Sequence, residues 1–504
     1  MQNAPSDWLH DRAARDPQRI FMRTAAGRTL TYGEFARMTT GFAATLQQRG
    51  ATKGDRVVAQ VDKSPEAIAL YLACLDLGAV FVPLNTAYTL AELEYFLADA
   101  EPRIVIVRPQ AAEPASEIAR RFGGRVETLD AEGSSSFAAQ AGVSFPRSDG
   151  DTNDLAALLY TSGTTGRSKG AMLTRGNLSS NAVTLAQAWR FTADDVLLHA
   201  LPIFHVHGLF VAINTVLAAG ASMVFLPRFD ASDALHALPR ATVMMGVPTF
   251  YTRLLQQAAL TRACAQHMRL FISGSAPLPP ETHREFEART GHSILERYGM
   301  SETLMNTSNP YDGERIPGSV GPPLPGVEVR ITDPGTGAVI RDPDAIGMIE
   351  VRGPNVFLGY WRMPDKTAAE LRSDGFFITG DLGRIDARGY VYIVGRGKDL
   401  IITGGYNVYP IEVEQEIDAL EGVVESAVIG APHPDFGEGV TAVVAMAEGA
   451  VLDESFVRSA LERRLAKFKL PKRIVFVAEL PRNAMGKVQK SVLRERYRDI
   501  YRSL

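Results

Sequence analysis

The chain reads Thr161-Ser162-Gly163-Thr164-Thr165-Gly166-Arg167-Ser168-Lys169-Gly170 directly after an apolar run at residues 155–159. The apolar run predicts a buried strand. The segment that follows holds three glycines and five hydroxyl side chains, which makes it a poor core element. Glycines let backbone N–H groups converge on one point, the hydroxyls add donors, and Arg167 and Lys169 add positive charge. The pattern favours a phosphate-binding loop after a strand over an ordinary solvated turn.

This loop is not a Walker A motif, which needs Gly, four residues and then Gly-Lys-Ser/Thr. Counting from Gly163, the position of the second glycine is taken by Ser168, so a P-loop nucleotide hydrolase is disfavoured. The segment instead resembles the ATP loop of the adenylate-forming superfamily, which includes acyl-CoA synthetases, peptide-synthetase adenylation domains and beetle luciferases. The resemblance implies that the phosphates of ATP are bound by Thr161, Ser162, Gly163, Thr164, Thr165, Gly166 and Lys169.

Composition narrows the class of protein. Lys and Arg number 53 against 57 Asp and Glu, a net charge of −4, so nothing points to a nucleic-acid partner. Cys74 and Cys264 are the two cysteines, which argues for a reducing compartment and against a disulfide framework. The most apolar stretch, residues 67–84, is interrupted by Asp76, Gly78 and Pro83. We therefore expect a cytoplasmic protein without a membrane span or a membrane partner.

Helical and strand patterns alternate along roughly the first 400 residues, which predicts an α/β fold. Examples are the strand pattern of residues 56–61 and the helix pattern of residues 64–77. Proline and glycine become dense at residues 313–344 and strands become short, as in a small β-rich subdomain. The resemblance adds a small mobile α+β lid at the C-terminus. The expected fold is thus a large N-terminal domain of α/β subdomains with a β-rich subdomain, followed by this lid.

A domain boundary is expected near Gly395-Arg396-Gly397-Lys398-Asp399, where two glycines give the backbone freedom. Charge also changes beyond this point. Residues 399–450 hold ten Asp or Glu and no Lys or Arg, whereas residues 451–504 hold fourteen Lys or Arg and six Asp or Glu. Two mutually attracting halves of one small domain, or a basic face for a polyphosphate, would each explain the contrast. The predicted domains are residues 1–397, with the ATP and acid sites, and the lid at 398–504.

A second motif, Glu296-Arg297-Tyr298-Gly299-Met300-Ser301-Glu302, follows a predicted strand end at Leu295. Its tyrosine offers a face to a purine, its glycine allows close backbone approach, and Ser301 and Glu302 offer oxygen atoms to a hard cation. Mg²⁺ favours one or two carboxylates together with phosphate oxygens. The segment resembles the superfamily motif Tyr-Gly-x-Thr-Glu, with Ser301 keeping the hydroxyl and losing the methyl. The resemblance implies nucleotide contacts by Tyr298, Gly299 and Ser301, and a Mg²⁺ ligand in Glu302.

Asp381 lies between two glycines in Phe377-Ile378-Thr379-Gly380-Asp381-Leu382-Gly383. A carboxylate can accept hydrogen bonds from both hydroxyls of a ribose. By itself this residue would be read as a turn aspartate, but the segment matches the Thr-Gly-Asp that supplies the ribose ligand of the superfamily. By the same resemblance Arg396 is a second ribose contact and Lys398 lies at the hinge.

Lys487 lies near the C-terminus in Pro481-Arg482-Asn483-Ala484-Met485-Gly486-Lys487, and it matches the catalytic lysine of the superfamily. Attack of a carboxylate on the α-phosphate brings two anions together, and a flexible cation that bridges them lowers the barrier. In the superfamily the lid then rotates, and a loop matching Gly404 and Gly405 lines the tunnel for the pantetheine of CoA. Acylating Lys487 would remove the charge, so a lysine acetyltransferase is a partner that would silence the first step.

The acid must be inferred from the acyl pocket. A dicarboxylate would need a buried cation, because an unpaired carboxylate in a dry site is very unfavourable. His207, in the segment 201–208, and Arg284, at a predicted helix start, are the two candidates, although Arg284 taken alone fits a solvated helix face better. Arginine can hold a carboxylate with two parallel hydrogen bonds.

Three segments, residues 199–202, 271–284 and 297–310, resemble bacterial malonyl-CoA synthetases. The resemblance implies that Arg284 and His207 orient the distal carboxylate, that Met305 limits the depth of the pocket, and that Ser275 is a polar contact. Arg228 is a weaker candidate for the phosphates of CoA. In this scheme Lys487, Glu302 and His207 are the catalytic residues.

The predicted function is therefore an ATP-dependent malonate–CoA ligase. Malonate, Mg²⁺-ATP and CoA would give malonyl-CoA, AMP and pyrophosphate through a malonyl-adenylate, with domain rotation between the half-reactions. The chain ends soon after Lys487 without a carrier domain, which favours free CoA as the acceptor. Methylmalonate or another short acid stays an alternative, because one methyl group is worth only about 1–3 kcal/mol of discrimination. A catalytically silent nucleotide-binding regulator is a second alternative, and the intact Glu302, Asp381 and Lys487 argue against it.

Overall fold

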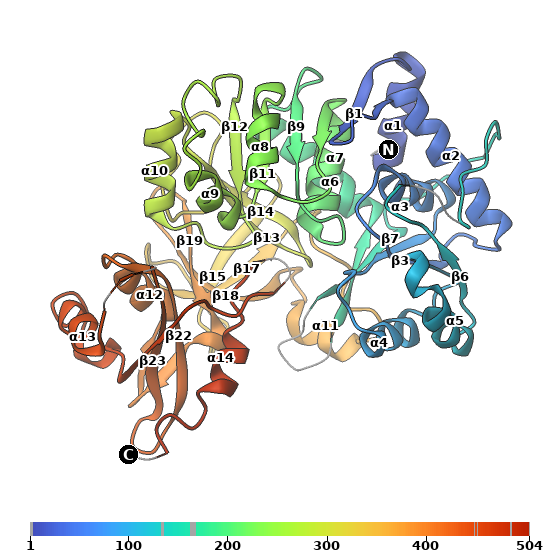
Figure 1. Cartoon of the computed structure of the whole chain (residues 1–504). Helices are drawn as coiled ribbons and strands as arrows, with labels where there is room; N and C mark the ends of the chain where they lie inside the picture. Colours follow the sequence, from blue (N-terminus) through green and yellow to red (C-terminus); the bar gives the residue numbers. More distant parts are fainter. Residues whose placement is uncertain are drawn as a thin grey trace. The chain divides into compact units, whose positions relative to one another are not determined.

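The computed structural model describes residues 4–132, 136–161, 168–447, 449–450, 452–483 and 486–502. They form two compact units, each with its own internal contacts. The first unit comprises Met1–Val329 and Val351–Phe377, and the second comprises Arg330–Glu350 and Ile378–Leu504 (Figure 1). Among the described residues, no helix combines the length and the apolar character that a membrane span requires.

An eight-stranded sheet forms one half of the first unit, in the order β14-β13-β12-β11-β9-β10-β1-β2. The six inner strands, β13, β12, β11, β9, β10 and β1, pair in parallel. The two edge strands, β2 and β14, pair antiparallel with their neighbours. The bounds are β1 (Ile20–Thr24), β2 (Thr29–Thr31), β9 (Val196–His199), β10 (Ser222–Phe225), β11 (Val243–Gly246), β12 (Leu270–Ser273), β13 (Leu295–Met300) and β14 (Leu304–Ser308).

Three helices pack on one face of this sheet: α8 (Ala231–Ala237), α9 (Pro248–Leu255) and α10 (Pro280–Thr290) (Figure 1). Their shared core contains Phe271 of β12, Tyr251 of α9 and Phe286 of α10, all fully buried. The rings of Tyr251 and Phe286 meet edge to face with their centroids 5.4 Å apart. Such aromatic contacts fix the helices against the strands and so fix the loops at the strand ends.

A six-stranded sheet in the order β6-β5-β3-β4-β7-β8 forms the other half of the first unit. Its strands are parallel except β8, which folds back on β7. The strands are β3 (Arg56–Gln60), β4 (Val80–Pro83), β5 (Ile104–Val107), β6 (Arg125–Thr128), β7 (Leu155–Thr161) and β8 (Lys169–Thr174). The remaining helices of the unit are α1 (Pro5–Arg15), α2 (Tyr32–Gln48), α3 (Pro65–Leu77), α4 (Leu90–Ala100), α5 (Ala112–Arg121), α6 (Arg175–Ala188), α7 (Asn214–Ala219) and α11 (Pro364–Glu370).

Local sequence explains these elements well. Helix α3 begins after Ser64, whose side chain accepts from the N–H of Ala67, and ends at Gly78 in the left-handed conformation. All of its residues are buried, as expected for a mostly apolar helix, and its Asp76 lies 2.7 Å from the ring of His10. The strand and helix predicted at residues 56–61 and 64–77 are therefore confirmed, and so is the α/β class.

The second unit contains two five-stranded sheets, ordered β16-β15-β17-β18-β19 and β21-β20-β23-β22, the latter with β24 on β23. The first comprises β15 (Glu328–Thr332), β16 (Val339–Ile340), β17 (Gly347–Arg352), β18 (Phe377–Ile385) and β19 (Val391–Arg396). The second comprises β20 (Ile401–Thr403), β21 (Tyr406–Val408), β22 (Val423–His433), β23 (Gly437–Met446) and β24 (Arg473–Val477). Helices α12 (Pro410–Asp418), α13 (Glu454–Glu462) and α14 (Lys490–Arg496) complete it.

One predicted boundary is wrong. The sequence predicts a strand end at Leu295, but β13 begins there and runs through the motif to Met300. Leu295 and Glu296 pair in parallel with β12, and the later residues pair antiparallel with β14. Charged residues after an apolar pair usually mark exposure, whereas Glu296 and Arg297 are buried inside the sheet.

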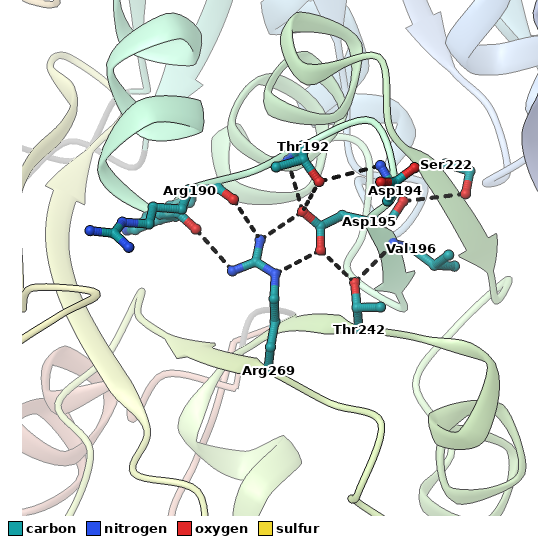
Figure 2. Close-up of polar contacts among 9 residues, drawn as sticks. Arg190, Thr192, Asp194, Asp195, Val196, Ser222, Thr242 and Arg269 are labelled. Carbon is teal, nitrogen blue, oxygen red and sulfur yellow. Dashed lines mark hydrogen bonds and ion pairs between the residues drawn. The ribbon is translucent and has the colours of Figure 1, made fainter.

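An ion pair fastens the amino-terminal ends of the central parallel strands (Figure 2). Arg269, just before β12, donates to both carboxylate oxygens of Asp195, just before β9, at 2.7 and 2.8 Å. The hydroxyl of Thr242, just before β11, donates to the same carboxylate at 2.7 Å. Burial alone would raise the pKa of Asp195, but hydrogen bonds from Arg269, Thr192 and Thr242 outweigh it and hold the pKa below its ordinary value. The cluster ties three strands together at the edge opposite their carboxyl ends.

We expect Asp195→Asn to lower the free energy of unfolding of the first unit by about 2–3 kcal/mol, because it leaves a partly buried guanidinium without its carboxylate. The folded-state pKa of Asp195 lies below its ordinary value of 3.8. The stabilisation is thus complete above that value and is lost as pH falls through the lower folded-state pKa. Denaturant titrations across pH should show the difference between wild type and variant closing in acid. Asp194→Asn, a change at a fully exposed neighbour, is the control. A difference that stays constant down to acid pH would contradict this role.

Candidate active site

The carboxyl ends of the parallel strands carry the polar residues that the sequence singled out. In open α/β sheets, ligands bind at this edge. In the first unit, β9 leads to His207, β12 leads to Ser275, and β13 with the turn after it carries Arg297 and Glu302. Strand β7 ends at Thr161, and β8 begins at Lys169 as its antiparallel neighbour. Residues 162–167, with the predicted Ser162, Gly163, Thr164, Thr165 and Gly166, lie outside the described residues.

Glu302 lies in a buried polar cluster with the ends of the phosphate loop. Its Oε1 accepts from the phenol of Tyr360 at 3.1 Å and from the hydroxyl of Thr161 at 3.5 Å. The same phenol lies 2.7 Å from Oε2 of Glu370 at the end of α11. Burial and the charge of Glu302 hold the pKa of Tyr360 far above its ordinary value, so the phenol keeps its proton. The cluster presents a buried carboxylate beside the predicted phosphate loop, which suits a cation that also contacts phosphate.

Lys169 supplies the positive charge of this cluster. Its ammonium lies 4.3 Å from the centre of the Tyr360 ring and 3.7 Å from Oε1 of Glu370. Burial would raise the pKa of Glu370, but Lys366, Tyr360 and Lys169 together lower it. Lys169 is buried among these groups at the start of β8. The lysine is thus fixed at the base of the loop, where a phosphate would meet it.

The segment after β9 forms a π-helix, η2 (His207–Ile213), in which every residue is buried. The ring of His199, at the end of β9, contacts the carbonyl of Gly208 at 2.7 Å and holds the first turn. A Cβ at Gly208 would overlap the carbonyl of Pro202, so only glycine fits there. π-Helical turns are rare and concentrate at functional sites. The turn places His207 in the interior.

Arg297 is the most unusual residue of the site. It is 3% exposed, and none of the described residues pairs with its Nε or Nη2. Its guanidinium lies against Gly274, where a Cβ would overlap it. Burial lowers the pKa of Arg297 to about 9. A buried guanidinium is unfavourable while its N–H groups lack partners, so this position suits an anionic ligand.

His207 lies in the same cluster. Its Nδ1 is 3.3 Å from the hydroxyl of Ser275, and none of the described residues pairs with its Nε2. Burial, followed by the positive charge of Arg297, holds the pKa of His207 well below its ordinary value. The ring is therefore neutral and offers one N–H rather than a second charge. Ser275 has a φ of 72°, a strained conformation for serine.

Met305, on strand β14, packs against Gly299 of the neighbouring strand β13. It is fully buried and lies opposite Gly299 in the pairing of β13 with β14. A Cβ at Gly299 would contact the methyl of Met305 and overlap the carbonyl of Leu304. Gly299 therefore lets β14 approach closely. Tyr298 and Ser301 lie half-buried on either side of this contact.

Two predicted residues lie apart from these clusters on the surface of the first unit. The side chain of Arg284 is 62% exposed and pairs with Glu281 at 2.6 Å within α10. Arg228 is exposed after β10, next to Phe229, whose ring stacks on Phe250 at 3.8 Å. The roles predicted for Arg284 and Arg228 stay predictions. An exposed helix face is a poor place to desolvate a carboxylate.

The second unit brings its two predicted ribose contacts together. Asp381 lies inside β18 rather than in a turn, and Arg396 is its partner in β19. Nε of Arg396 lies 2.7 Å from Oδ1 of the nearly buried Asp381. Lys398 follows in a short 3₁₀ turn, and burial lowers its pKa.

Two tight turns of the second unit carry the remaining predicted residues. Gly404 and Gly405 link β20 to β21 with φ values of 57° and 81°, which glycine adopts most readily. Lys487 lies in a short loop where its N–H donates to Oδ1 of Asn483 at 3.0 Å, and the N–H of Asn483 donates to the carbonyl of Lys487 at 2.9 Å. These two hydrogen bonds fix the backbone of Lys487 opposite Asn483, and residues 484 and 485 lie outside the described residues.

Three functional side chains escaped the sequence reasoning: Arg297, Tyr360 and Glu370. Arg297 stood inside a recognised motif, directly before Tyr298, but no role was assigned to it. The signal that could have found it is a charged residue between apolar and glycine positions of a parallel strand. Tyr360 and Glu370 are too far from Lys169 and Glu302 in sequence for any spacing rule to join them.

Comparisons with known proteins identify the family. A model described as AMP-binding enzyme matches residues 9–361, and one described as AMP-binding enzyme C-terminal domain matches residues 412–487. The chain belongs to the AMP-binding enzyme family, and its fold is that of adenylate-forming enzymes, with a large N-terminal and a small C-terminal domain.

Three individual relatives show how similar this chain is to proteins of named activity. The ATP-bound structure of MatB from Rhodopseudomonas palustris is 60% identical with a TM-score of 0.96, covering 98% of this chain and 99% of that one. The mitochondrial malonate–CoA ligase ACSF3 of Mus musculus is 38% identical, covering 82% of this chain and 77% of that protein. The indoleacetate–CoA ligase of Aromatoleum aromaticum is 36% identical over 97% of each chain. Relatives at similar identity thus act on chemically different acids.

Tyr360→Phe tests the cluster around Glu302. Losing a hydrogen bond to a charged group should raise KM for Mg²⁺-ATP about tenfold, while the retained ring preserves the contact with Lys169. Steady-state pyrophosphate release with varied Mg²⁺-ATP measures this. Tyr71→Phe, which removes another buried phenol that bonds Asn214 at 3.2 Å, should leave KM for Mg²⁺-ATP unchanged. Equal KM values in wild type and Tyr360→Phe would contradict the assigned support of Glu302.

Proposed function

We propose that this protein is an ATP-dependent malonate–CoA ligase. It converts malonate, ATP and CoA to malonyl-CoA, AMP and pyrophosphate through a malonyl-adenylate. The 60% identity to MatB and the match to malonate–CoA ligase ACSF3 support this assignment over the aryl and long-chain acids used by other relatives.

The observation that carries the choice of acid is the buried group of N–H donors at Arg297 and His207. Malonate has a second carboxylate beyond the one that reacts, and this carboxylate must enter the protein interior with a partner. Arg297 can donate two parallel hydrogen bonds to it, and neutral His207 can donate a third. An aryl or alkyl acid would leave the guanidinium unpaired. In this proposal Arg297 takes the role that the sequence assigned to Arg284, which is exposed and already paired with Glu281.

The rest of the first unit holds the nucleotide. Lys169 and the hydroxyl of Thr161, with the loop between them, bind the phosphates, and Tyr298 and Gly299 face the adenine. Glu302 fits Mg²⁺, because its buried carboxylate already lies beside Thr161 and Lys169 and is oriented by Tyr360. When bound, Mg²⁺ would neutralise charge on the phosphates of ATP. Met305 limits the length of the acid.

The second unit supplies the groups that change between half-reactions. Asp381 accepts from the ribose hydroxyls, with Arg396 holding its carboxylate. Lys487 bridges the attacking carboxylate and the α-phosphate in adenylation, and its ammonium stabilises the charge of the transition state. The C-terminal domain then turns about Lys398, Lys487 leaves, and the loop at Gly404 and Gly405 admits the thiol of CoA. Arg228 is proposed to contact the CoA phosphates.

We also propose a cellular compartment for the protein and a way in which its activity is regulated. Cys74 and Cys264 are free thiols, which suits the reducing cytoplasm. Acylation of Lys487 by a lysine acetyltransferase would remove the charge that adenylation needs.

Pyrophosphate release with CoA and a panel of acids tests the proposal: acetate, propionate, malonate, methylmalonate, succinate, benzoate and octanoate. We expect malonate to have the highest kcat/KM, and Arg297→Met to lower that value by about 10²-fold or more through loss of a buried charge pair. The variant should melt no lower than wild type, because it replaces a buried unpaired cation with an apolar side chain.

Arg284→Met is the matched control and should leave malonate activity unchanged. Preference for a monocarboxylate would overturn malonate as the substrate. A loss in Arg284→Met but not in Arg297→Met would return the carboxylate to Arg284. Silence with every acid would favour a nucleotide-binding regulator.

Lys487→Ala separates the two half-reactions. Without the bridging cation, adenylation of malonate should slow by about 10²–10³-fold, the usual effect of removing one group that stabilises transition-state charge. Thioester formation from supplied malonyl-adenylate and CoA should stay close to the wild-type rate. Enzyme acetylated at Lys487 should behave like the variant. Unchanged pyrophosphate release in either protein would refute the role of Lys487.

A further inference from the structure

Strand β14 is an edge strand that pairs with β13, and a side chain also holds the backbone of Met305 on it. Asn181, on α6, donates from Nδ2 to the carbonyl of Met305 at 2.9 Å. Its Oδ1 accepts from the N–H of Met305 at 3.3 Å. Asn181 is 2% exposed, and both ends of its amide are used on one residue. The asparagine thus replaces the missing strand at one position.

A second asparagine holds the residues around Met305. Nδ2 of Asn355 donates to the carbonyl of Thr303 at 2.6 Å and lies 3.2 Å from the carbonyl of Met305. Between these two residues, Leu304 has a φ of 52°, a left-handed conformation that is unfavourable for leucine. A strained residue persists only where its surroundings determine its conformation. The two asparagines determine it here.

The side chain of Met305 is fully buried and apolar, so packing holds it and not hydrogen bonds. Methionine is flexible and adapts to irregular gaps, so its methyl stays against Gly299 because the backbone beneath it is fixed. If Met305 limits the depth of the acyl pocket, the hydrogen bonds of Asn181 set where that limit lies.

We propose that Asn181 is a specificity-determining positioning residue, which excludes longer acids by fixing the backbone of Met305. The inference rests on the proposed function, in which Met305 limits the length of the acid. Asn181 does not itself touch the substrate in this account. Its removal takes away two hydrogen bonds on the backbone of Met305, while β13 and Asn355 still hold β14 in place. Met305 can then shift and open room for one more methylene group.

The test compares kcat/KM for succinate, one methylene longer than malonate, with kcat/KM for malonate in the full-length enzyme. We expect Asn181→Ala to raise the succinate-to-malonate ratio by about tenfold or more, the usual discrimination for one methylene. Met305→Ala should raise the same ratio, and the double variant should gain little more, because both changes act on one contact. Asn181→Asp keeps the acceptor and loses the donor, so it should shift the ratio in the same direction if Asn181→Ala does not fold.

Ser179→Ala is the control on the same helix, since the hydroxyl of Ser179 donates to the carbonyl of Arg175, at 2.8 Å, and is buried like Asn181. It should leave the ratio at the wild-type value, and thermal melting shows that each variant is folded. An unchanged ratio in folded Asn181 variants, with a raised ratio in Met305→Ala, overturns the inference and leaves the proposed function intact. An unchanged ratio in Met305→Ala as well overturns the inference together with the role of Met305. A wild-type enzyme without preference for malonate overturns the proposed function itself.

Discussion

A buried positive charge, two of whose nitrogens have no partner among the described residues, is the constraint on which the site depends. Arg297 is held inside the sheet by β13, and its guanidinium lies against Gly274 at the end of β12. Leaving such a charge unpaired costs several kcal/mol in a folded protein. An anionic ligand of the right shape recovers that free energy on binding. Burial, and after it this same charge, lowers the pKa of His207 and keeps the ring neutral, so the cluster offers N–H donors without adding a second, repelling cation.

Several unfavourable features of the first unit lie at the carboxyl edge of its eight-stranded sheet. Ser275 and Leu304 have left-handed backbone conformations, His207 begins a π-helix, and Arg297 is desolvated. At the opposite edge, Asp195 and Arg269 form a fully compensated ion pair with Thr242 (Figure 2). The aromatic core under α9 and α10 adds further stability. Strain at the binding edge is therefore tolerated because the remainder of the same sheet is well packed and well paired.

Local signals in the sequence predicted much of this architecture. Apolar runs located β3, β7 and α3. Asp381 and Arg396 were predicted as two contacts of one ribose, and the structure pairs them across β18 and β19 at 2.7 Å. The sequence could not predict which charged residues are buried by segments that lie far away along the chain. Arg284 and Arg297 are the same residue type, yet Arg284 lies on an exposed helix face and Arg297 lies inside a sheet. The predicted strand end at Leu295 is wrong for the same reason, because the charged residues after it suggest exposure and are in fact buried in β13.

Contacts between segments that are distant in sequence could not be predicted either. Tyr360 lies 58 residues from Glu302, and Asn181 lies 124 residues from Met305. No periodicity or motif spacing encodes such pairs. The π-helical turn at His207 also has no sequence signal of its own, apart from a glycine at 208 that fits where a Cβ would not.

A crystal structure of the enzyme with a non-hydrolysable analogue of malonyl-adenylate tests the central claim most directly. The quantity to measure is the distance from the guanidinium nitrogens of Arg297 to the distal carboxylate oxygens. We predict two contacts of about 2.7–2.9 Å, the length of charge-assisted hydrogen bonds. A distal carboxylate bound by Arg284 or by solvent, with Arg297 left unpaired or bonded to a protein group, would contradict the account.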